Sequence, residues 1–475
     1  MISQMKKNKK TLLAFALIIS LILCAELFIN GSAYLNAKFN PGENRTSFDS
    51  LYIRIGVEYL LLNIIYLVWL VQNKRRSQYS NFLNILKVSS IFILIAFISY
   101  PISTDIYLYL HYGLMDLNGI NPFVNTAASF NSQLSPLLAW FQTSTYGPAS
   151  QLLFAISAYF TSVSINFGVY IFKLFCMIGH IVNGYLIWRQ LKSSQHQTNL
   201  TIAYLLNPLI LFEQVTNAHL DVFICTSLIL LIICIEQRRY VLSVSATLVG
   251  FLTKTIPIIW LPLLFMFLVR QKQWKSLTIV TILFLAIVCT LSITVFPTSK
   301  AWMSILNSGV ELTAGSLHNI VASIVKNIEQ LLQNSTNNSY RITKITTSGF
   351  KILTYLVFVI YYVCTLFKIY FRQRYSTTNL ILDIGWTTLV LFLFATPWYQ
   401  PWYCSILLPI VALYASSSFF VLTTLTFCIS STSYYLLIYP NAPGPFFVLV
   451  SIITVLPTIL VLLLRTKLLQ AIAHP

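Results

Sequence analysis

The sequence predicts an all-α polytopic membrane protein, a bundle of about 11–14 transmembrane helices. Hydrophobic residues make up 57% of the 475-residue chain and charged residues only 9%, whereas a soluble protein carries roughly a quarter charged residues. Apolar runs of about 20 residues, long enough to cross a bilayer as a helix, recur along the chain. Lysine and arginine gather in the short segments between these runs, as they do in the loops that orient membrane proteins.

The expected transmembrane segments follow one another along the whole chain. The first has the basic head and apolar body of a secretion signal, but Leu23 stands where cleavage needs a small residue, so we expect a retained helix. The run 149–165 is expected to enter the membrane only partway, because a full crossing would reverse the charge pattern after it. The expected spans are 11–30, 51–71, 83–101, 166–188, 199–213, 220–236, 241–257, 258–270, 276–296, 349–368, 379–396, 402–415, 419–437 and 446–464.

The distribution of basic residues predicts that both termini are cytoplasmic. With this orientation, 20 of the 30 basic residues fall in cytoplasmic positions. The formal net charge of +18 is then explained by loop residues, and we expect no nucleic-acid partner. The clusters are Lys6, Lys7, Lys9, Lys10, Lys74, Arg75, Arg76, Lys87, Arg189, Lys192, Arg238, Arg239, Arg270, Lys272, Lys275, Lys368, Arg372, Arg374, Arg465 and Lys467.

This orientation divides the chain into five parts. They are the N-terminal transmembrane helices (1–101), a first outer loop (102–148), central transmembrane helices (149–296), a second outer loop (297–348) and C-terminal transmembrane helices (349–475). Shorter outer turns lie at 212–222, 396–403 and 439–445. The eight cysteines lie mostly in apolar runs without a CxxC pair, so we expect buried apolar side chains and no disulfide, metal or cofactor.

The acidic residues point to the outer side of the membrane. Asp105, Asp116, Glu213, Asp221 and Glu311 fall in outer loops or at outer ends of spans. Such residues are functional candidates, although each could instead lie among headgroups and water. The stretch around Asp105, PISTDIYLYLHYGLMDLNGINPF (101–123), contains no lysine or arginine. A carboxylate without a neighbouring cation stays basic, which suits a general base that takes a proton from a hydroxyl. Tyr107, Tyr109 and Tyr112 could line a sugar site there or belong to an interfacial aromatic belt.

A second polar cluster occupies the stretch NPLILFEQVTNAHLDVF (207–223). Its Asn-Pro step is expected to break a helix just before an outer turn. Glu213, Asn217, His219 and Asp221 then fall within nine residues. The His-x-Asp spacing could bind a metal, but it lacks a clear third ligand, so contacts to a phosphate or sugar are favoured.

A cation is expected close to this cluster. Lys254, in GFLTKTIPIIWLP (250–262), lies near the outer end of its span beside a proline. It could snorkel to the interface or supply a point charge for a phosphate oxygen. A basic carboxylate, a cation, a histidine and aromatic residues at the membrane edge are what a membrane glycosyltransferase needs when its donor is a sugar on a polyprenyl phosphate. Its main electrostatic task is to stabilise the leaving phosphate.

Other classes of membrane protein remain open at this point. A secondary transporter or a flippase for lipid-linked sugar would be expected to place charges and broken helices near the midplane, often in repeated halves. An envelope polysaccharide polymerase or ligase would be expected to use arginines and histidines in a large outer loop. The first outer loop contains neither lysine nor arginine. A non-catalytic scaffold is a further alternative.

The motifs, in their order along the chain, resemble those of the GT-C glycosyltransferases, in particular bacterial polyprenyl-phosphate-mannose-dependent mannosyltransferases. The first outer loop is similar to their Asp-x-Tyr-x-Tyr signature followed by Gly-x-Asn-Pro-aromatic. TYGPASQLLFA (145–155), the Asn-Pro turn, LTKTIP (252–257) and ATPWYQPWYCSILLP (395–409) look like the motifs that follow. The similarity is clearest over about residues 85–265. The departures, such as Leu108 where an arginine is common and His111 where an aromatic is common, lie beside the expected sugar site and leave the hexose open.

The resemblance implies a GT-C-type bundle with short in-plane helices in its extracytoplasmic loops. It implies inverting transfer of a hexose, mannose above all, from a polyprenyl-phosphate donor to a glycan, glycolipid or cell-envelope acceptor. The reaction would take place on the extracytoplasmic face of a bacterial cytoplasmic membrane, in contact with membrane lipids and without a cofactor. Asp105 would be the catalytic base. The expected substrate-binding residues are Tyr107, Tyr109, His111, Asn121, Tyr146, Glu213, Asn217, His219, Asp221, Lys254, Trp398 and Tyr399.

Overall fold

The computed structural model describes residues 2–39, 49–72, 81–306, 313–332, 339–438 and 444–468. Within these ranges the chain is helical and contains no strand beyond one isolated bridge, between Ala314 and Trp398. Eight helices are long and apolar enough to cross a membrane, and four shorter ones are also apolar. The predicted all-helical polytopic class is confirmed. Glu311, residues 74–76 and most of the turn 439–445 lie outside the described ranges.

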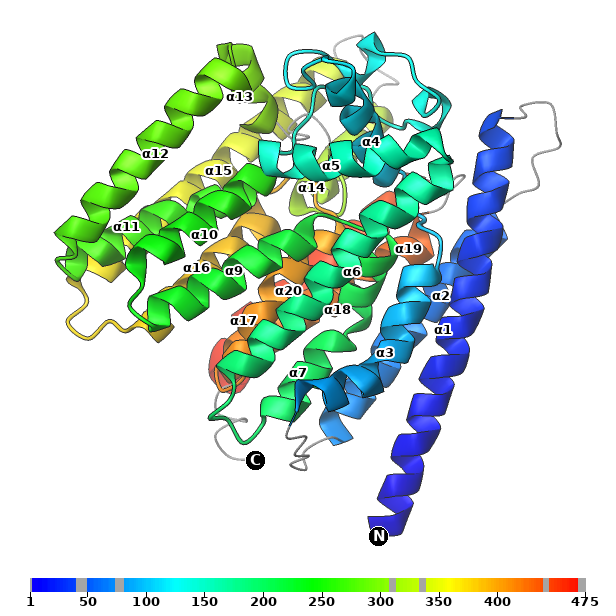
Figure 1. Cartoon of the computed structure of the whole chain (residues 1–475), viewed down its shortest axis with the longest axis horizontal. Coiled ribbons are helices and arrows are strands. Elements are labelled where there is room, and N and C mark those ends of the chain that lie inside the picture. Colours follow the sequence, from blue (N-terminus) through cyan, green and yellow to red (C-terminus); the bar gives the residue numbers. More distant parts are fainter. Residues whose placement is uncertain are drawn as a thin grey trace. The chain divides into compact units, whose positions relative to one another are not determined.

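The chain forms two compact units. Figure 1 colours the chain by residue number, from blue at the N-terminus to red at the C-terminus. The first contains residues 1–261 and 273–308, and the second contains residues 262–272 and 309–475. The helices of the first unit are α1 (Ile2–Phe39), α2 (Asp49–Gln72), α3 (Phe82–Ile98), α4 (Asp105–Leu117), α5 (Pro148–Tyr159), α6 (Ile165–Gln190), α7 (Gln197–Leu205), α8 (Pro208–Ile210), η4 (Leu211–Thr216), α9 (Asp221–Glu236), α10 (Tyr240–Thr253), α12 (Trp274–Thr294) and α13 (Ser299–Leu306).

Two features of the first unit decide where its polar residues lie. Asn207 follows the end of α7 and caps α8, because its side chain accepts a hydrogen bond from the Ile210 N–H. Pro208, the first residue of α8, has no backbone N–H that would need an acceptor there. The segment η4 that follows is a π-helix, a wide turn that is often found at functional sites. The expected break at Asn-Pro is therefore present.

Helix α5 packs directly on α4, the helix that begins at Asp105. A Cβ atom on Gly113 would lie 2.3 Å from the carbonyl oxygen of Phe154, so the backbones of these helices are in contact. The rings of Tyr109 and Phe154 stack alongside, with centroids 4.9 Å apart. With 12 residues, α5 is about 18 Å long and too short to cross a hydrocarbon core of about 30 Å.

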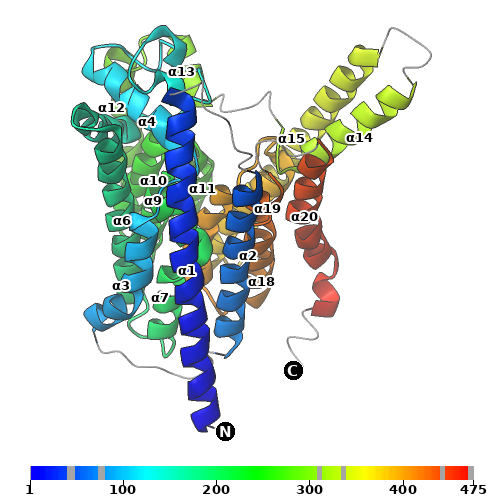
Figure 2. The same cartoon turned by 90° about the vertical axis from the view of Figure 1, so that its right-hand side faces the viewer.

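The second unit contains most of the remaining helices. They are α11 (Trp260–Arg270, of which only the first two residues belong to the first unit), α14 (Leu317–Leu332), α15 (Ser339–Phe371), α16 (Thr377–Val390), η6 (Leu391–Ala395), η7 (Pro401–Leu407), α17 (Leu408–Leu413), α18 (Ser418–Ser431), α19 (Tyr434–Leu437) and α20 (Gly444–Leu463). Figure 2 shows α14 and α15 side by side. The stretch expected to be the second outer loop thus contains α13, α14 and the start of α15.

Candidate functional site

Asp105 opens helix α4 at the end of a short connection from α3. Its backbone N–H donates to the Ser103 hydroxyl at 3.3 Å, and an acidic residue in the first turn is favoured by the helix dipole. The side chain is half-buried. The Asp105 carboxylate therefore lies at the start of α4, and the residues that follow it in this helix are buried.

The connection that carries Asp105 is attached to the turn after η4 through Asn217. The Asn217 side-chain oxygen accepts from the N–H groups of Ile102 at 3.0 Å and Ser103 at 3.4 Å. The Asn217 amide nitrogen donates to Glu213 Oε2 at 3.3 Å. One fully buried amide thus links the two stretches in which the sequence placed candidate residues.

Glu213 and His219 form the second part of the site. His219 Nε2 lies 3.6 Å from Glu213 Oε2, and both side chains are fully buried. The His219 N–H also donates to the Glu213 carbonyl at 3.0 Å, which closes the turn, and Ala218 takes a positive φ of 55° within it. Burial lowers the pKa of His219 well below its usual range and Lys254 lowers it further, so the imidazole is neutral at pH 7.

Asp221 and Lys254 form a buried ion pair beside this turn. Lys254 Nζ donates to both carboxylate oxygens of Asp221, at 3.0 and 2.9 Å. Asp221 is the first residue of α9, and Lys254 follows the last residue of α10. The two positions are 33 residues apart in the chain, and the packing of α10 on α9 brings them together.

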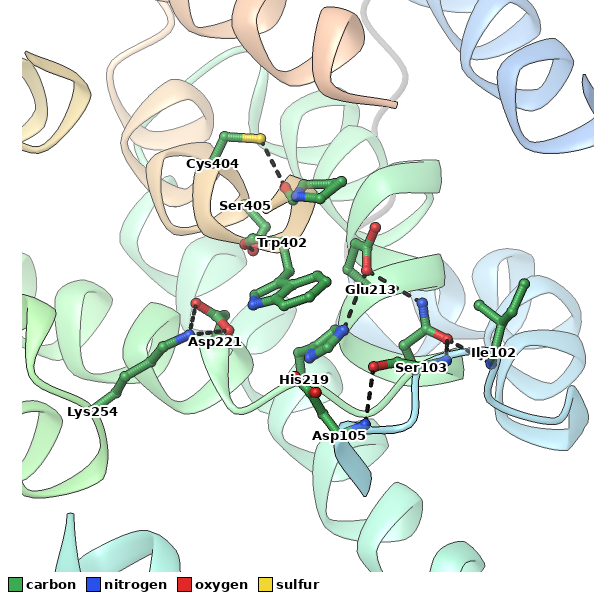
Figure 3. A network of polar contacts seen from close by, with 12 residues as sticks. Ile102, Ser103, Asp105, Glu213, His219, Asp221, Lys254, Trp402, Cys404 and Ser405 are labelled. Atoms are coloured by element: carbon green, nitrogen blue, oxygen red, sulfur yellow. Dashed lines mark hydrogen bonds and ion pairs between the residues drawn. The ribbon is translucent and has the colours of Figure 1, made fainter. Parts of the chain in front are cut away.

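The environment of Asp105 makes its carboxyl group a stronger base than an exposed aspartate. Burial raises its pKa to about 6, nearby Lys254 lowers it and Asp221 raises it. No cation flanks Asp105 in the sequence, but in space α10 brings one close enough to act on its charge. Figure 3 shows Asp105, His219 and the Asp221–Lys254 pair in one polar cluster. Asp105 thus combines partial exposure with a pKa near neutrality.

A buried lysine that the sequence reasoning missed supports this cluster. Lys173, in α6, is fully buried and donates to the carbonyl oxygens of Ala96 at 3.3 Å, Thr216 at 2.9 Å and Ser99. Its ammonium group ties the end of α3 to the end of η4. The available signal was a single cation in the middle of the apolar run 166–188, which is costly unless it has a role.

The tyrosines of α4 lie in the interior rather than on an exposed belt. The Tyr107 hydroxyl is 3.0 Å from that of Tyr100, and its ring stacks on Tyr34. The Tyr109 ring meets the edge of Tyr146, with centroids 4.9 Å apart. Tyr146 is half-buried, whereas Tyr107 and Tyr109 are buried, so of these three predicted site residues only Tyr146 is partly exposed.

His111 and Asn121 hold the first outer loop together in this structure. The His111 ring nitrogens lie 2.9 Å from the Ser132 hydroxyl and 3.0 Å from the Ala127 carbonyl oxygen. The Asn121 side chain donates to the Val295 carbonyl at 2.8 Å and accepts from the Phe123 N–H at 2.8 Å. Both side chains thus have structural partners in the loop or at the end of α12, outside the cluster around Asp105.

Trp398 and Tyr399 belong to the second unit. Their segment pairs with Ala314, whose N–H donates to the Pro397 carbonyl at 3.2 Å and whose carbonyl accepts from the Tyr399 N–H at 2.9 Å. The Tyr399 hydroxyl lies 2.8 Å from that of Ser431.

Among the side chains that the structure describes, no three of His, Cys, Asp or Glu are placed to hold one metal ion.

The fold and the cluster describe an integral-membrane protein with ionisable side chains gathered at the ends of its helices. A family model described as "Alpha-(1->6)-mannopyranosyltransferase, N-terminal domain" matches residues 44–270, a range that contains Asp105, Glu213, His219, Asp221 and Lys254. Residues 44–270 are similar to this family, and the protein is a membrane mannosyltransferase of the GT-C class. The resemblance noted in the sequence is thereby confirmed. No curated protein and no solved structure shows a significant match.

Proposed function

We propose that this mannosyltransferase takes mannose from a polyprenyl-phosphate carrier and transfers it to an acceptor hydroxyl, with inversion at the anomeric carbon. The acceptor is a glycan, glycolipid or cell-envelope polymer, and the matched description favours the 6-hydroxyl of a mannose. The site faces the extracytoplasmic side of a bacterial cytoplasmic membrane, with both chain termini in the cytoplasm. The distribution of basic residues along the chain supports this orientation.

The observation that carries the proposal is the half-buried Asp105 carboxylate beside the Asp221–Lys254 pair. A general base works best when its pKa is near the working pH, and Asp105 has a pKa of about 6. Of the three carboxylates in the cluster, Asp221 is paired with Lys254 and Glu213 packs against the neutral His219. Asp105 is the third. Asp105 is thus the carboxylate best suited to accept a proton from the sugar hydroxyl.

The reaction needs one bond to form and one to break. The acceptor oxygen attacks the anomeric carbon of mannose as its proton moves to Asp105. The bond between that carbon and the phosphate oxygen breaks, and the electron pair leaves with the polyprenyl phosphate. A catalyst for this reaction must stabilise the charge that grows on the phosphate.

Lys254 is the group we assign to that charge. Its side chain is 12% exposed, whereas that of Asp221 is 1% exposed, so the ammonium is the accessible half of the pair. An ammonium group has three N–H donors, and Lys254 can contact a phosphate oxygen while it holds Asp221. Asp221 fixes the lysine at the end of α10 and so keeps the cation in place before substrate binds.

The remaining candidates receive supporting roles in this proposal. Tyr146 offers an aromatic edge for the mannose ring, backed by Tyr109 and Tyr107. Glu213 and Asn217 hold the Asp105 connection and His219. His111 and Asn121 support the first outer loop through their contacts with Ser132, Ala127 and Val295.

The test compares Asp105→Asn with Asp116→Asn. Asp116 lies in the last turn of the same helix and is exposed, so its replacement makes the same chemical change away from the cluster. Purified proteins in nanodiscs receive polyprenyl-phosphate [¹⁴C]mannose and an oligomannose acceptor. We expect Asp105→Asn to lose about 10²–10⁴-fold in kcat, the range set by removal of a general base, and Asp116→Asn to keep wild-type activity.

Two outcomes would overturn parts of the proposal. Equal turnover by wild type and Asp105→Asn would exclude Asp105 as the base. Transfer by wild type from a nucleotide-linked mannose, with none from the polyprenyl donor, would exclude the lipid donor while keeping the mannosyltransferase assignment.

A further inference from the structure

The second unit contains a cavity that the transfer reaction does not use. Its volume is about 750 Å³, and it lies among α15, α16, α18 and α20. Each of these helices, extended in two cases by the short helix that follows it, is long and apolar enough to cross a membrane. A cavity of this size is typical of sites for small molecules.

The polar residues of the cavity lie at or near the ends of these helices. Lys368 is three residues before the end of α15, and Arg465 follows α20 by two residues. Ser416, Ser417 and Ser418 form the turn into α18. A membrane-crossing helix places its ends at the level of the lipid headgroups, so the cations and hydroxyls of the cavity lie at that level.

The charges of the cavity leave a net positive site. Lys368 Nζ is 2.6 Å from Asp383 Oδ1, and the other oxygen of Asp383 accepts from the Tyr375 hydroxyl at 2.8 Å. Arg465 carries the second positive charge, and its guanidinium lies 5.4 Å from the centre of the Phe419 ring. Two cations face one carboxylate, which favours an anionic occupant.

An apolar part of the lining follows α16 and η6. Trp386, which stacks on Phe419 with centroids 5.6 Å apart, is followed along the chain by Leu389 and Val390 in α16 and by Leu393 in η6. The lining from Leu382 to Val390 extends about 12 Å along the helix. The cavity thus joins a cationic, hydroxyl-rich end to an apolar wall that runs into the membrane.

We propose that this cavity binds an anionic phospholipid. Arg465, Lys368 and the Ser416–Ser418 turn hold its phosphate, and its acyl chain lies along Trp386, Leu389 and Val390. Basic pockets between membrane helices are a recurrent way to bind such headgroups. The binding is separate from mannose transfer and can be measured without it.

The experiment uses full-length delipidated protein in a non-ionic detergent and measures binding by native mass spectrometry. The ligands are dioctanoyl phosphatidylglycerol, dioctanoyl phosphatidylcholine, a short-chain polyprenyl phosphate and inorganic phosphate. We expect phosphatidylglycerol to bind at least tenfold more tightly than phosphatidylcholine. Arg465→Gln should weaken phosphatidylglycerol binding at least tenfold. Lys467→Gln is the matched control, because Lys467 lies two residues further on, is exposed and does not line the cavity, and it should bind like wild type.

A second variant tests the apolar wall. Val390→Trp should fill part of the cavity and weaken phosphatidylglycerol binding. Equal binding of the two lipids, or an unchanged affinity in Arg465→Gln, would overturn the proposal. Displacement of the lipid by inorganic phosphate at equal concentration would identify a free-anion site, and tighter binding of polyprenyl phosphate would identify a carrier-lipid site. Either result would also overturn it.

Discussion

Each unit of the protein contains an aspartate–lysine pair, and the two pairs differ in how they are enclosed. In the first unit, Lys254 holds both oxygens of Asp221, and the side chains are 12% and 1% exposed. In the second unit, Lys368 holds one oxygen of Asp383, Tyr375 holds the other, and the side chains of Lys368 and Asp383 are 42% and 6% exposed.

The Asp221–Lys254 pair is therefore mostly buried, whereas the lysine of the Asp383–Lys368 pair is open to water. A buried pair is costly to break, because removal of one partner leaves a charge without compensation. A pair open to water is screened and contributes little. Asp383 would keep the Tyr375 hydroxyl after loss of its lysine, whereas both oxygens of Asp221 depend on Lys254. The same two residue types should therefore respond very differently to the same substitution.

The largest effect is expected for Lys254→Met. Asp221 would be left buried and charged, and the free energy of unfolding should fall by about 3–5 kcal/mol, measured by sodium dodecyl sulfate titration in mixed micelles. The KM for the polyprenyl donor should rise more than that for the acceptor. The double variant Lys254→Met/Asp221→Asn removes both charges and should recover most of the stability while the donor KM stays raised. Recovery of donor affinity in the double variant would argue against a phosphate contact by Lys254.

Lys173→Met should have the next largest effect. Loss of the ammonium removes a donor from the carbonyls of Ser99 and Thr216, whereas the Ala96 carbonyl keeps the Thr216 hydroxyl at 3.0 Å. Loss of a donor to a buried carbonyl costs about 1–3 kcal/mol. The Asp105 connection would then shift relative to Asn217, and small misplacements can lower kcat by about 10²-fold. Steady-state kinetics should show this loss in kcat with little change in either KM. A rise in KM with constant kcat would assign Lys173 to substrate binding instead.

The pH dependence should reveal the balance of charges around Asp105. A base must be deprotonated to act, so kcat/KM should fall as the pH decreases through about 6, the pKa of Asp105. Lys254 lowers this pKa and Asp221 raises it. Asp221→Asn should therefore move the acidic limb to lower pH, and Lys254→Met should move it to higher pH. The profile of Lys368→Met should coincide with that of wild type, and a shift there would contradict the separation of the two pairs.

The smallest effect is expected for Lys368→Met. Its pair is partly exposed, and such pairs contribute about 1 kcal/mol or less. Mannose transfer should remain at the wild-type level, and the thermal unfolding midpoint should change little. A loss of stability as large as that of Lys254→Met would show that exposure does not distinguish the two pairs.

Much of the fold was predictable because hydrophobic length and helix punctuation are local properties. The run 276–296 became α12 (Trp274–Thr294), and the Asn207-Pro208 step ended one helix and began the next. The helix bounds within 199–216 were harder, because a π-helix has no strong composition signal of its own. The five-part domain division and the membrane orientation remain predictions.

The candidate site was predictable in composition but not in pairing. Asp105, His219, Asp221 and Lys254 were singled out by residue type at the ends of apolar runs. That Lys254 meets Asp221 depends on how α10 packs on α9, over a separation of 33 residues, which no local pattern encodes. The roles of His111 and Asn121 as supports for the loop likewise depend on contacts with Ala127, Ser132 and Val295. Lys173 was passed over because its partners are main-chain atoms, which carry no signature in the sequence.

The π-helix η4 gives the site a dependence on chain length rather than on residue identity. A π-turn contains one residue more than an α-turn, and each residue turns an α-helix by about 100°. Three residues in η4 or just after it make contacts that build the site. Glu213 faces His219, the Thr216 carbonyl accepts from Lys173, and Asn217 holds the connection that carries Asp105. Loss of a single residue between 211 and 216 would rotate these groups away from one another even if every side chain were kept. Comparisons among distant relatives should therefore align this stretch by its spacing, because an insertion or deletion here changes the chemistry more than a substitution does.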